Sequence, residues 1–169
     1  MTYAQPERIA ARHETEGFDC GSQAQTTWLR RHALQADRTD STRVMVVTRQ
    51  GEQRVVGFHA LSAGSVEPAI APRRVAAGLP RYPVPVVLLT RLGVDLAEQG
   101  RGLGRALVKD ALLRAAAAAE TVAARALVVH CESDEAKAFY LRLAEFEPSP
   151  TDPLHRYLLM SDLRRSLGD

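Results

Sequence analysis

The sequence predicts an α/β fold in which helices flank one mixed sheet, and three observations support this prediction. The chain has 169 residues, of which 46% are hydrophobic and 25% charged, a composition typical of one globular domain with a single core. Short β-branched runs alternate along the chain with segments of helical periodicity. Between residues 84 and 131 an apolar run, a long helical segment and a second apolar run follow one another, which is typical of parallel strands joined by a crossover helix. We therefore expect residues 1–169 to form a single domain.

The first half of the chain is expected to contain a helix and a β-hairpin. Ser22–Leu34 has apolar residues on one side and charged residues on the other, as in a surface helix. Two β-branched runs, Arg43–Arg49 and Arg54–Leu61, flank a turn that contains Gly51, and this arrangement predicts a hairpin. The polar segment that follows is expected to be a loop, with a short helix around Arg73–Ala77.

The second half supplies the remaining elements. Val84–Val94 is the most apolar stretch and is expected to be a central strand buried on both faces. Gly102–Ala119 carries one apolar stripe, which predicts a helix, and with a strand at Ala126–Cys131 it should form a right-handed crossover. Ser133–Leu143 is expected to be a helix capped by its first serine. Leu154–Met160 is expected to be the last strand, before a charged tail.

Composition and spacing argue against several classes of function. The net charge of +2 is too small to indicate nucleic-acid binding by itself. No apolar run approaches the ~18 residues of a membrane span, and the N-terminus lacks the apolar segment of a secretory signal. Cys20 and Cys131 are too few and too far apart for a zinc site or a disulfide framework, and the histidines have no metal-ligand spacing. We expect a cytoplasmic protein with reduced thiols and no metal.

A glycine-rich segment between the expected central strand and the next helix is the clearest candidate binding site. Gly100, Gly102 and Gly104 allow the backbone to adopt positive φ and to approach a ligand closely. The free N–H groups at the helix start, together with the helix dipole, favour a phosphate or pyrophosphate, and Arg101 and Arg105 add positive charge. The segment has neither the Gly-Lys-Ser/Thr ending of a Walker loop nor the G-x-G-x-x-G spacing of a dinucleotide site.

The spacing Gln99-x-x-Gly102-x-Gly104 resembles the pyrophosphate loop of the GNAT superfamily of acetyl-CoA-dependent N-acetyltransferases. The segment Ala136–Tyr140 resembles the helix of that superfamily whose tyrosine faces the sulfur of CoA. A phenol with a pKa of ~10 can protonate a leaving thiolate of pKa ~8.5 when it is held in place. The resemblance implies acetyl-CoA as co-substrate, no metal, and a GNAT-like mixed sheet in which a splayed pair of parallel strands forms the acetyl-CoA cleft.

The resemblance extends over nearly the whole chain to one branch, the GNAT toxins of bacterial type II toxin–antitoxin systems. Its most specific part is the proline-rich entry Leu79–Pro85, followed by Arg91-Leu92-Gly93-Val94-Asp95. Such toxins transfer acetyl from acetyl-CoA to the α-amino group of the amino acid on charged tRNA, which blocks translation. The resemblance also implies a homodimer, a ribbon-helix-helix antitoxin that neutralises the enzyme, operator DNA bound only through that antitoxin, and no membrane.

The resemblance assigns roles to the matching positions. Tyr140 is expected to be the catalytic group. Backbone contacts to the pantetheine arm are expected from Leu92, Gly93 and Val94. The expected pyrophosphate loop comprises Gln99, Gly100, Arg101, Gly102, Leu103, Gly104 and Arg105. Because guanidinium groups suit phosphate contacts, the candidates for tRNA contact are Arg30, Arg31, Arg73, Arg74 and Arg81.

Departures from the family pattern keep other functions open. The family helix usually ends Tyr-x-x-x-Gly-Phe, whereas this chain has Ala144-Glu145 before Phe146. A left-handed residue other than glycine costs ~1 kcal/mol, so we expect a strained helix end and reduced activity. His59 stands where the branch often has an aromatic residue, and His130 is a mild candidate for a general base. The alternatives are a GNAT enzyme that acts on a small amine or a protein N-terminus, and a degenerate GNAT binding or repressor subunit.

Overall fold

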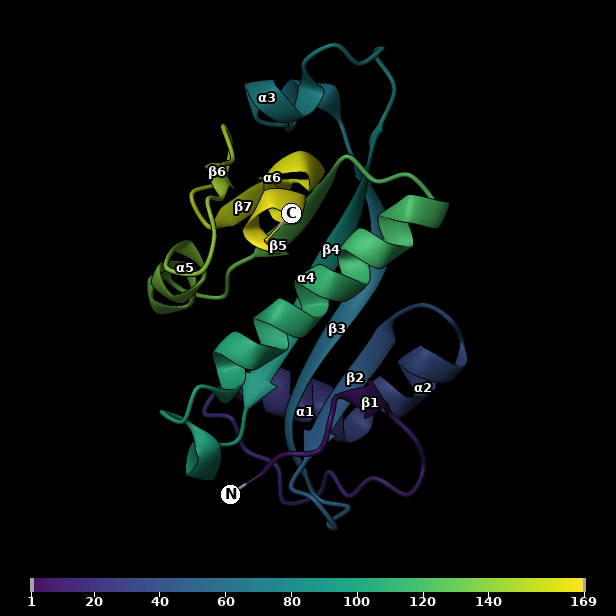
Figure 1. Ribbon diagram of the computed structural model, residues 1–169, viewed down its shortest axis with the longest axis vertical. Helices are drawn as coiled ribbons and strands as arrows, with labels where there is room; N and C mark the ends of the chain where they lie inside the picture. The colour runs from purple at the N-terminus through teal and green to yellow at the C-terminus, as the bar shows by residue number, and fades with distance from the viewer. Residues whose placement is uncertain (1, 169) are drawn as a thin grey trace. The chain divides into compact units, whose positions relative to one another are not determined.

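The computed structural model describes residues 2–168 and contains a seven-stranded sheet with the strand order β1-β2-β3-β4-β5-β7-β6 (Figure 1). The chain divides into two compact units, residues 2–62 with 90–111 and residues 63–89 with 112–168. Three elements run from one unit into the other: β3 (Val55–Val66), β4 (Val84–Val94) and α4 (Leu103–Thr121).

The other elements each belong to one unit. The first unit contains β1 (Glu7–Arg8), α1 (Gln23–Arg31), α2 (Ala33–Arg38), β2 (Arg43–Thr48) and the 3₁₀ turn η2 (Leu96–Glu98). The second contains the 3₁₀ turn η1 (Pro68–Ile70), α3 (Arg73–Ala76), β5 (Ala126–His130), α5 (Asp134–Leu141), β6 (Glu147–Pro148), β7 (His155–Leu159) and α6 (Met160–Ser166). The predicted α/β class with a mixed sheet is confirmed, because β4 pairs with β5 in parallel whereas β1–β2, β2–β3, β5–β7 and β6–β7 are antiparallel.

In the first unit, strand β2 is buried on both faces and separates two apolar clusters. The predicted hairpin is confirmed, with Val46 of β2 opposite Phe58 of β3. Val46 and Phe58 belong to a cluster that includes residues of α1 and the N-terminal segment. The neighbouring Val47 belongs to the other cluster, together with Leu103 and Leu107 from the first turns of α4. The start of α4 is therefore held against the sheet by apolar packing.

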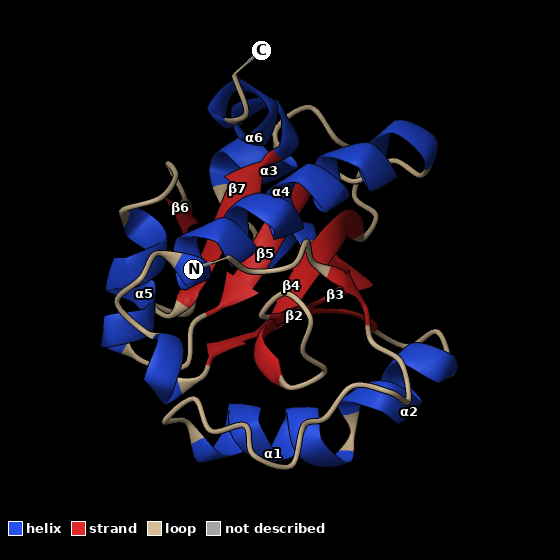
Figure 2. Ribbon diagram, turned by 60° about the horizontal axis from the view of Figure 1, so that its bottom comes forward, coloured by secondary structure: helices blue, strands red, loops and turns tan. Residues whose placement is uncertain are grey.

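The predicted single helix at Ser22–Leu34 is two helices, α1 and α2, which Figure 2 shows as separate ribbons. The helix starts as expected, since the Ser22 side chain accepts a hydrogen bond from the Gln25 N–H (3.2 Å). His32 interrupts it with φ −123° and ψ −24°, and its N–H still bonds to the Trp28 carbonyl (2.8 Å). Apolar periodicity continues through this break, so the pattern alone does not reveal it.

In the second unit, the predicted parallel pairing is confirmed. The pairing of β4 with β5 runs from Val86 opposite Ala126 to Leu89 opposite Val129. Strand β5 is paired on its other side with β7, in antiparallel orientation. A Cβ atom added at Gly64 would lie 2.7 Å from Leu88 Cδ1, so β3 requires a glycine where it crosses this side chain.

Several boundaries and one burial prediction were wrong. Strand β3 continues to Val66, well past the predicted end at Leu61. Strand β4 has the predicted bounds, but Pro85 and Thr90 are exposed, so it is not buried on both faces. The expected charged tail is helix α6, because its apolar residues, among them the fully buried Leu163, form one packed face. The short strands β1 and β6 have no signal of their own in the sequence.

Candidate active site

The predicted glycine loop lies between the end of β4 and the start of α4. Gly100 and Gly102 have φ of +81° and +85°, a conformation that residues with a side chain rarely adopt. A Cβ atom added at either position would meet nothing within 4 Å, so the space beside this backbone is open. The first N–H groups of α4 have no acceptor within the helix. The loop thus combines open space, free N–H donors and the positive end of the helix dipole.

Asp95 fixes the chain where it leaves β4. Its carboxylate is buried and accepts hydrogen bonds from the N–H of Ala97 (2.9 Å), where it caps η2, and from the N–H of Asp19 (3.2 Å). Arg54 pairs with the same carboxylate at 3.2 Å. The Asp95 N–H also donates to the Val56 carbonyl (2.9 Å). In the sequence Asp95 is the last residue of the Arg91–Asp95 motif, and in the structure it holds the strand end that precedes the loop.

Glu98 is a second buried carboxylate beneath the loop, and sequence reasoning missed it. It is 1% exposed, accepts a hydrogen bond from the Tyr3 hydroxyl (2.6 Å) and forms an ion pair with Arg49. Arg101 lies 3.7 Å from it. The hydrogen bond from Tyr3 and then that from Arg49 lower the pKa of Glu98, so it stays ionised. Its partners are distant in sequence, and no local pattern could have revealed them.

Gln99 is hydrogen-bonded to the end of β4, the strand segment predicted to contact the pantetheine arm. The Gln99 side-chain amide donates to the Val94 carbonyl (2.9 Å) and to the Cys20 carbonyl (3.1 Å). At Gly93 a Cβ atom would lie 3.0 Å from the Phe58 ring and 3.1 Å from Cys20 Sγ. A side chain at this position would therefore displace the core, and the glycine allows the backbone of β4 to lie close to its neighbours.

Tyr140, the predicted catalytic residue, lies on α5 in the second unit. Helix α5 begins as predicted, since Ser133 accepts a hydrogen bond from the Ala136 N–H (3.1 Å). The Tyr140 ring is 7% exposed and packs edge-on against Phe139 and Phe146, with centroid distances of 5.3 and 6.1 Å. Among the described residues its hydroxyl has no hydrogen-bond partner, so it is available to a ligand.

The surroundings of Tyr140 keep its hydroxyl protonated. Burial raises the pKa of Tyr140 well above its ordinary value, and the nearby Cys131 adds to the shift. Burial likewise raises the pKa of the Cys131 thiol. His130 stacks on His155 with ring centroids 3.7 Å apart. Burial, and then the charge of His155, lower the pKa of His130, so its neutral form prevails near neutral pH. A neutral imidazole is the form that a general base requires.

The expected strain at the end of α5 is absent. Arg142 closes the helix in a right-handed conformation, and the Leu143 N–H bonds back to the Tyr140 carbonyl (2.9 Å). Residues 142–146 contain no positive φ, since Asp40 is the only non-glycine residue with one in the described chain. Phe146 still reaches the interior and contacts the Tyr140 ring. The inserted residue is accommodated in the turn, so it does not require the left-handed conformation.

The predicted tRNA-contacting arginines fall into two groups. Arg30 and Arg31 on α1, together with Arg73 and Arg81, are exposed and form no ion pair within residues 2–168. Arg74 pairs with Glu147 and with Asp162, the latter at 2.9 Å. Its charge is therefore already neutralised within the second unit.

The first unit thus carries a candidate anion site and the second a protonated, unbonded phenol. Among residues 2–168 no group of three or more His, Cys, Asp or Glu side chains is arranged to hold a metal ion. Within the same residues no helix is both long and apolar enough to cross a membrane. Free N–H donors are suited to bind a phosphate group, and a protonated phenol is suited to donate a proton to a leaving group.

Comparison with known proteins agrees with this chemistry. The acetyltransferase (GNAT) family pattern matches residues 9–146. A tRNA-acetylating toxin of Mycobacterium tuberculosis (strain ATCC 25618 / H37Rv) is 47% identical over 167 residues, which are 99% of this chain and 98% of that protein.

Solved structures extend the likeness to the fold. A structure of AtaT complexed with acetyl-methionyl-tRNAfMet matches with a TM-score of 0.87 and 25% identity, over 97% of this chain and 98% of that chain. A crystal structure of AtaTR bound with AcCoA matches with a TM-score of 0.84 and 25% identity, over 96% of each chain. These matches confirm the predicted GNAT-like fold. The chain belongs to the acetyltransferase (GNAT) family.

Proposed function

We propose that the protein is a toxin that uses acetyl-CoA to acetylate the α-amino group of aminoacyl-tRNA and thereby blocks translation. The observation that carries this proposal is the 47% identity to a tRNA-acetylating toxin over 99% of the chain. The match extends over the loops and helices outside the acetyl-CoA loop, and connecting loops are the parts of a fold that vary most and carry specific function. The solved complex of AtaT with acetyl-methionyl-tRNAfMet supports the same acceptor.

The glycine loop is proposed to hold the pyrophosphate of acetyl-CoA. Gln99 through Arg105 supply two glycines at positive φ, open space and the first N–H groups of α4. Arg101 and Arg105 add positive charge at the rim. The backbone of Leu92, Gly93 and Val94 is proposed to contact the pantetheine arm. Acetyl-CoA supplies the acetyl group as an activated thioester.

Tyr140 is proposed to donate a proton to the thiolate that leaves when the acetyl group is transferred. A phenol of ordinary pKa, about 10, is already protonated at neutral pH, and the raised pKa of Tyr140 leaves that unchanged. Its hydroxyl makes no competing hydrogen bond in the described chain. The aromatic contacts with Phe139 and Phe146 fix the ring. A positioned donor of this kind contributes typically 10²–10⁴-fold to a rate.

The acceptor amine places little demand on a general base. A terminal α-amino group titrates at ~7.7–8.0, so a substantial fraction is already neutral near pH 7.5. The amine of an aminoacyl ester is expected to lose its proton at still lower pH. Water or the neutral form of His130 is sufficient to accept the proton that the attacking amine releases.

The partners are proposed from the family. We infer that the chain forms one domain, acts as a homodimer in the cytoplasm, and is neutralised by a ribbon-helix-helix antitoxin that also mediates binding to operator DNA. Arg30, Arg31, Arg73 and Arg81 remain candidates for tRNA contact because they are exposed and unpaired in the described chain. Arg74 is the weakest candidate because Glu147 and Asp162 already neutralise it.

The deciding experiment follows radiolabelled acetyl from acetyl-CoA into acid-precipitable RNA, with a bulk pool of charged tRNA. Uncharged tRNA is the matched control. Hydrolysis of the ester then releases the N-acetyl amino acid, which chromatography identifies. We expect label on charged tRNA only, and the released product names the amino acid that is chosen.

Two results would overturn the proposal in different ways. Acetyl-CoA binding without label on charged tRNA, together with turnover of free amines or peptide N-termini, indicates an enzyme for another acceptor. Failure to bind acetyl-CoA at all indicates a degenerate binding subunit. The relaxed turn after Tyr140 removes the structural reason for expecting such degeneracy.

A further inference from the structure

We propose that His155, held by Asp152, is a positioning residue that keeps His130 oriented to accept the proton of the attacking amine. All three residues lie in the second unit, with His130 at the end of β5, His155 at the start of β7 and Asp152 in the turn before β7. Because this amine is the acceptor of the acetyl group, the inference rests on the proposed function.

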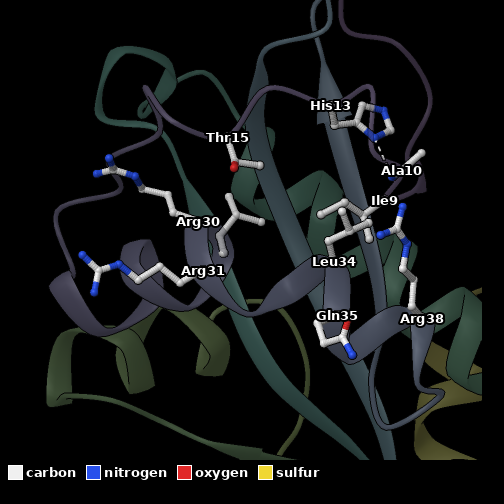
Figure 3. A pocket seen from close by; sticks show the side chains of 10 residues that line it. Ile9, Ala10, His13, Thr15, Arg30, Arg31, Leu34, Gln35 and Arg38 are labelled. Carbon is white, nitrogen blue, oxygen red and sulfur yellow. Dashed lines mark hydrogen bonds between the residues drawn. The ribbon is translucent and has the colours of Figure 1, made fainter.

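Both ring nitrogens of His130 are open to a substrate. His130 is exposed, and neither of its ring nitrogens forms a hydrogen bond among the described residues. His13 differs, because its Nδ1 accepts from the Ala10 N–H (2.9 Å, Figure 3) and its Nε2 lies 2.8 Å from a Glu7 oxygen. His59 is fully buried. A substrate amine can therefore reach His130 but neither of these two other rings.

The stack of His130 on His155 follows from the pairing of β5 with β7. The two residues lie opposite each other in the antiparallel register, and opposite residues place their side chains on the same face of a sheet. Their ring centroids are 3.7 Å apart and their ring planes are 15° from parallel. Contact over a whole ring face restricts rotation of the His130 side chain and leaves the ring edge, which carries both nitrogens, uncovered.

The turn before β7 fixes the second ring of the stack. One oxygen of the Asp152 carboxylate accepts a hydrogen bond from the Leu154 N–H (2.9 Å), and the other lies 3.4 Å from His155 Nε2. The His155 N–H donates to the Asp152 carbonyl (3.2 Å), and the His155 carbonyl accepts from the Ser149 N–H (3.1 Å). His155 is therefore held in place before a substrate arrives, as a positioning residue requires.

His155 and Asp152 also act on the charge of His130, in opposite directions. Burial and then the positive charge of His155 lower the pKa of His130, whereas the negative charge of Asp152 raises it and offsets part of the shift. Among the described residues these are the two charged groups that act on the His130 ring. A neutral ring near pH 7 has the lone pair that accepting a proton requires.

The proton acceptor and the proton donor lie on opposite sides of β5. Cys131 follows His130 and continues the pairing with β7, because its N–H bonds to the Leu154 carbonyl (2.8 Å). Successive residues of a strand point to opposite faces, and the Cys131 thiol is on the side where it acts on the pKa of Tyr140. The two groups are thus separated, so Tyr140 does not protonate His130 directly.

These two groups balance the protons of the transfer. The amine nitrogen forms a bond to the thioester carbonyl carbon, and the bond from that carbon to sulfur breaks with its electron pair on sulfur. Tyr140 gives its proton to the sulfur, and His130 takes the proton that the nitrogen releases. Exchange with solvent then returns a proton to Tyr140 and removes one from His130.

The test measures kcat for charged tRNA against pH in the full chain. The variants are His130→Gln, His155→Phe, His155→Ala and the double variant His155→Phe with Asp152→Asn. His32→Gln is the matched control, because His32 is exposed and lies in the first unit. Titration of the ring C–H resonance of His130 by NMR reports its pKa in the free protein, independently of catalysis.

Each variant has its own expected result. His130→Gln should lower kcat by about 10²-fold, the lower end for a positioned base, because water also accepts the proton. His155→Phe keeps a stacked ring but removes a positive charge, so the pKa of His130 and the acid limb of kcat should move to higher pH. Adding Asp152→Asn to His155→Phe removes an attracting charge and should move both to lower pH again. His155→Ala should lower kcat about tenfold on the pH plateau, because the His130 ring is no longer held.

The amine contributes the same titration in every variant, so differences between the variants come from the protein. A kcat for His130→Gln equal to that for His32→Gln would overturn the inference. So would a pKa of His130 and a kcat that neither His155 variant changes. If His155→Ala does not fold, His155→Phe carries the same test.

Failure of the proposed function gives a different result. If charged tRNA is not acetylated but a free amine is, the proposed function is wrong and the same series is measured with that amine. If no amine is acetylated, His130 accepts no proton from an acceptor, and both the proposed function and the role of His155 are wrong.

Discussion

Replacement of Gly102 by alanine and by glutamate separates the backbone requirement of the loop from its ligand. Gly102 has a φ of +85°, and a Cβ atom at this position would meet nothing within 4 Å. The alanine variant therefore suffers conformational strain without a steric clash. The glutamate variant suffers the same strain and adds a negative charge where we place the pyrophosphate.

The magnitudes follow from these two terms. A non-glycine residue in the left-handed region costs about 1–2 kcal/mol, and for a chain of this length each kcal/mol lowers Tm by about 2–4 °C. Both variants should therefore lose about 2–8 °C. In the glutamate variant, the two negative charges of the pyrophosphate repel the introduced carboxylate. At a separation of about 6 Å and an effective dielectric constant of about 40, as in a partly exposed site, this repulsion costs about 3 kcal/mol. Only the glutamate variant should then lose more than about 100-fold in acetyl-CoA affinity.

The assay combines thermal unfolding with calorimetric titration of acetyl-CoA. The alanine variant should remain within about tenfold of the wild-type affinity, because the strain is present in both the free and the bound protein. If the glutamate variant binds acetyl-CoA as tightly as the alanine variant does, the pyrophosphate does not lie beside Gly102. If neither variant loses stability, the left-handed conformation of this residue is not required.

Three further predictions follow from the buried groups. Tyr140→Phe should lose most turnover while retaining Tm and acetyl-CoA affinity, because only the unbonded hydroxyl is removed; unchanged turnover excludes Tyr140 as the proton donor. The folded-state pKa of Asp37 lies below its ordinary value of 3.8, so its ion pairs with Arg8 and Arg43 stabilise the fold above that pH and are lost as the pH falls through the folded pKa. Below about pH 4, the Tm of Asp37→Asn should therefore depend less on pH than the wild-type Tm does. Curves of Tm against pH that run parallel for the two proteins contradict this. His59 is fully buried and its Nε2 lies 2.8 Å from Asp110, so a double-mutant cycle with His59→Leu and Asp110→Asn should give a coupling of about 0.5–3 kcal/mol in unfolding free energy; a coupling of zero means that the pair contributes nothing to stability.

The elements that could be predicted from the sequence are those with a strong local signal. Strand β4 has the predicted ends because turn residues bound its apolar run, and α5 starts where Ser133 caps it. The elements that could not be predicted depend on distant partners. Helix α6 is an example, because Asp162 in its first turn is neutralised by Arg74 from another part of the chain. Its charged residues therefore resemble a solvated tail when the sequence is considered alone.

The candidate site shows the same division. The sequence predicted that Gly100, Gly102 and Gly104 allow a backbone with positive φ. Gly100 and Gly102 adopt it, whereas Gly104 lies inside α4 and does not. The prediction of strain after Tyr140 was wrong. It assumed that the turn typical of the family is preserved, whereas the extra residue permits a turn without a left-handed residue. The resemblance could assign a role to Tyr140, but only the fold shows that its ring is buried and its hydroxyl unbonded within the described chain.

Anion binding by a helix start requires a backbone that is held in place before the ligand arrives, because ordering a loop on binding reduces affinity. Two glycines with open space around them cannot supply this rigidity. The residues on either side do: Glu98 joins the beginning of the loop to Tyr3 and Arg49, and Leu103 anchors the end of the loop in an apolar cluster. The open space that the glycines leave for a ligand is therefore held in place by contacts of the loop ends with the N-terminal segment and β2. For this reason we expect substitutions at Tyr3 or Glu98 to weaken acetyl-CoA binding although neither residue belongs to the glycine motif.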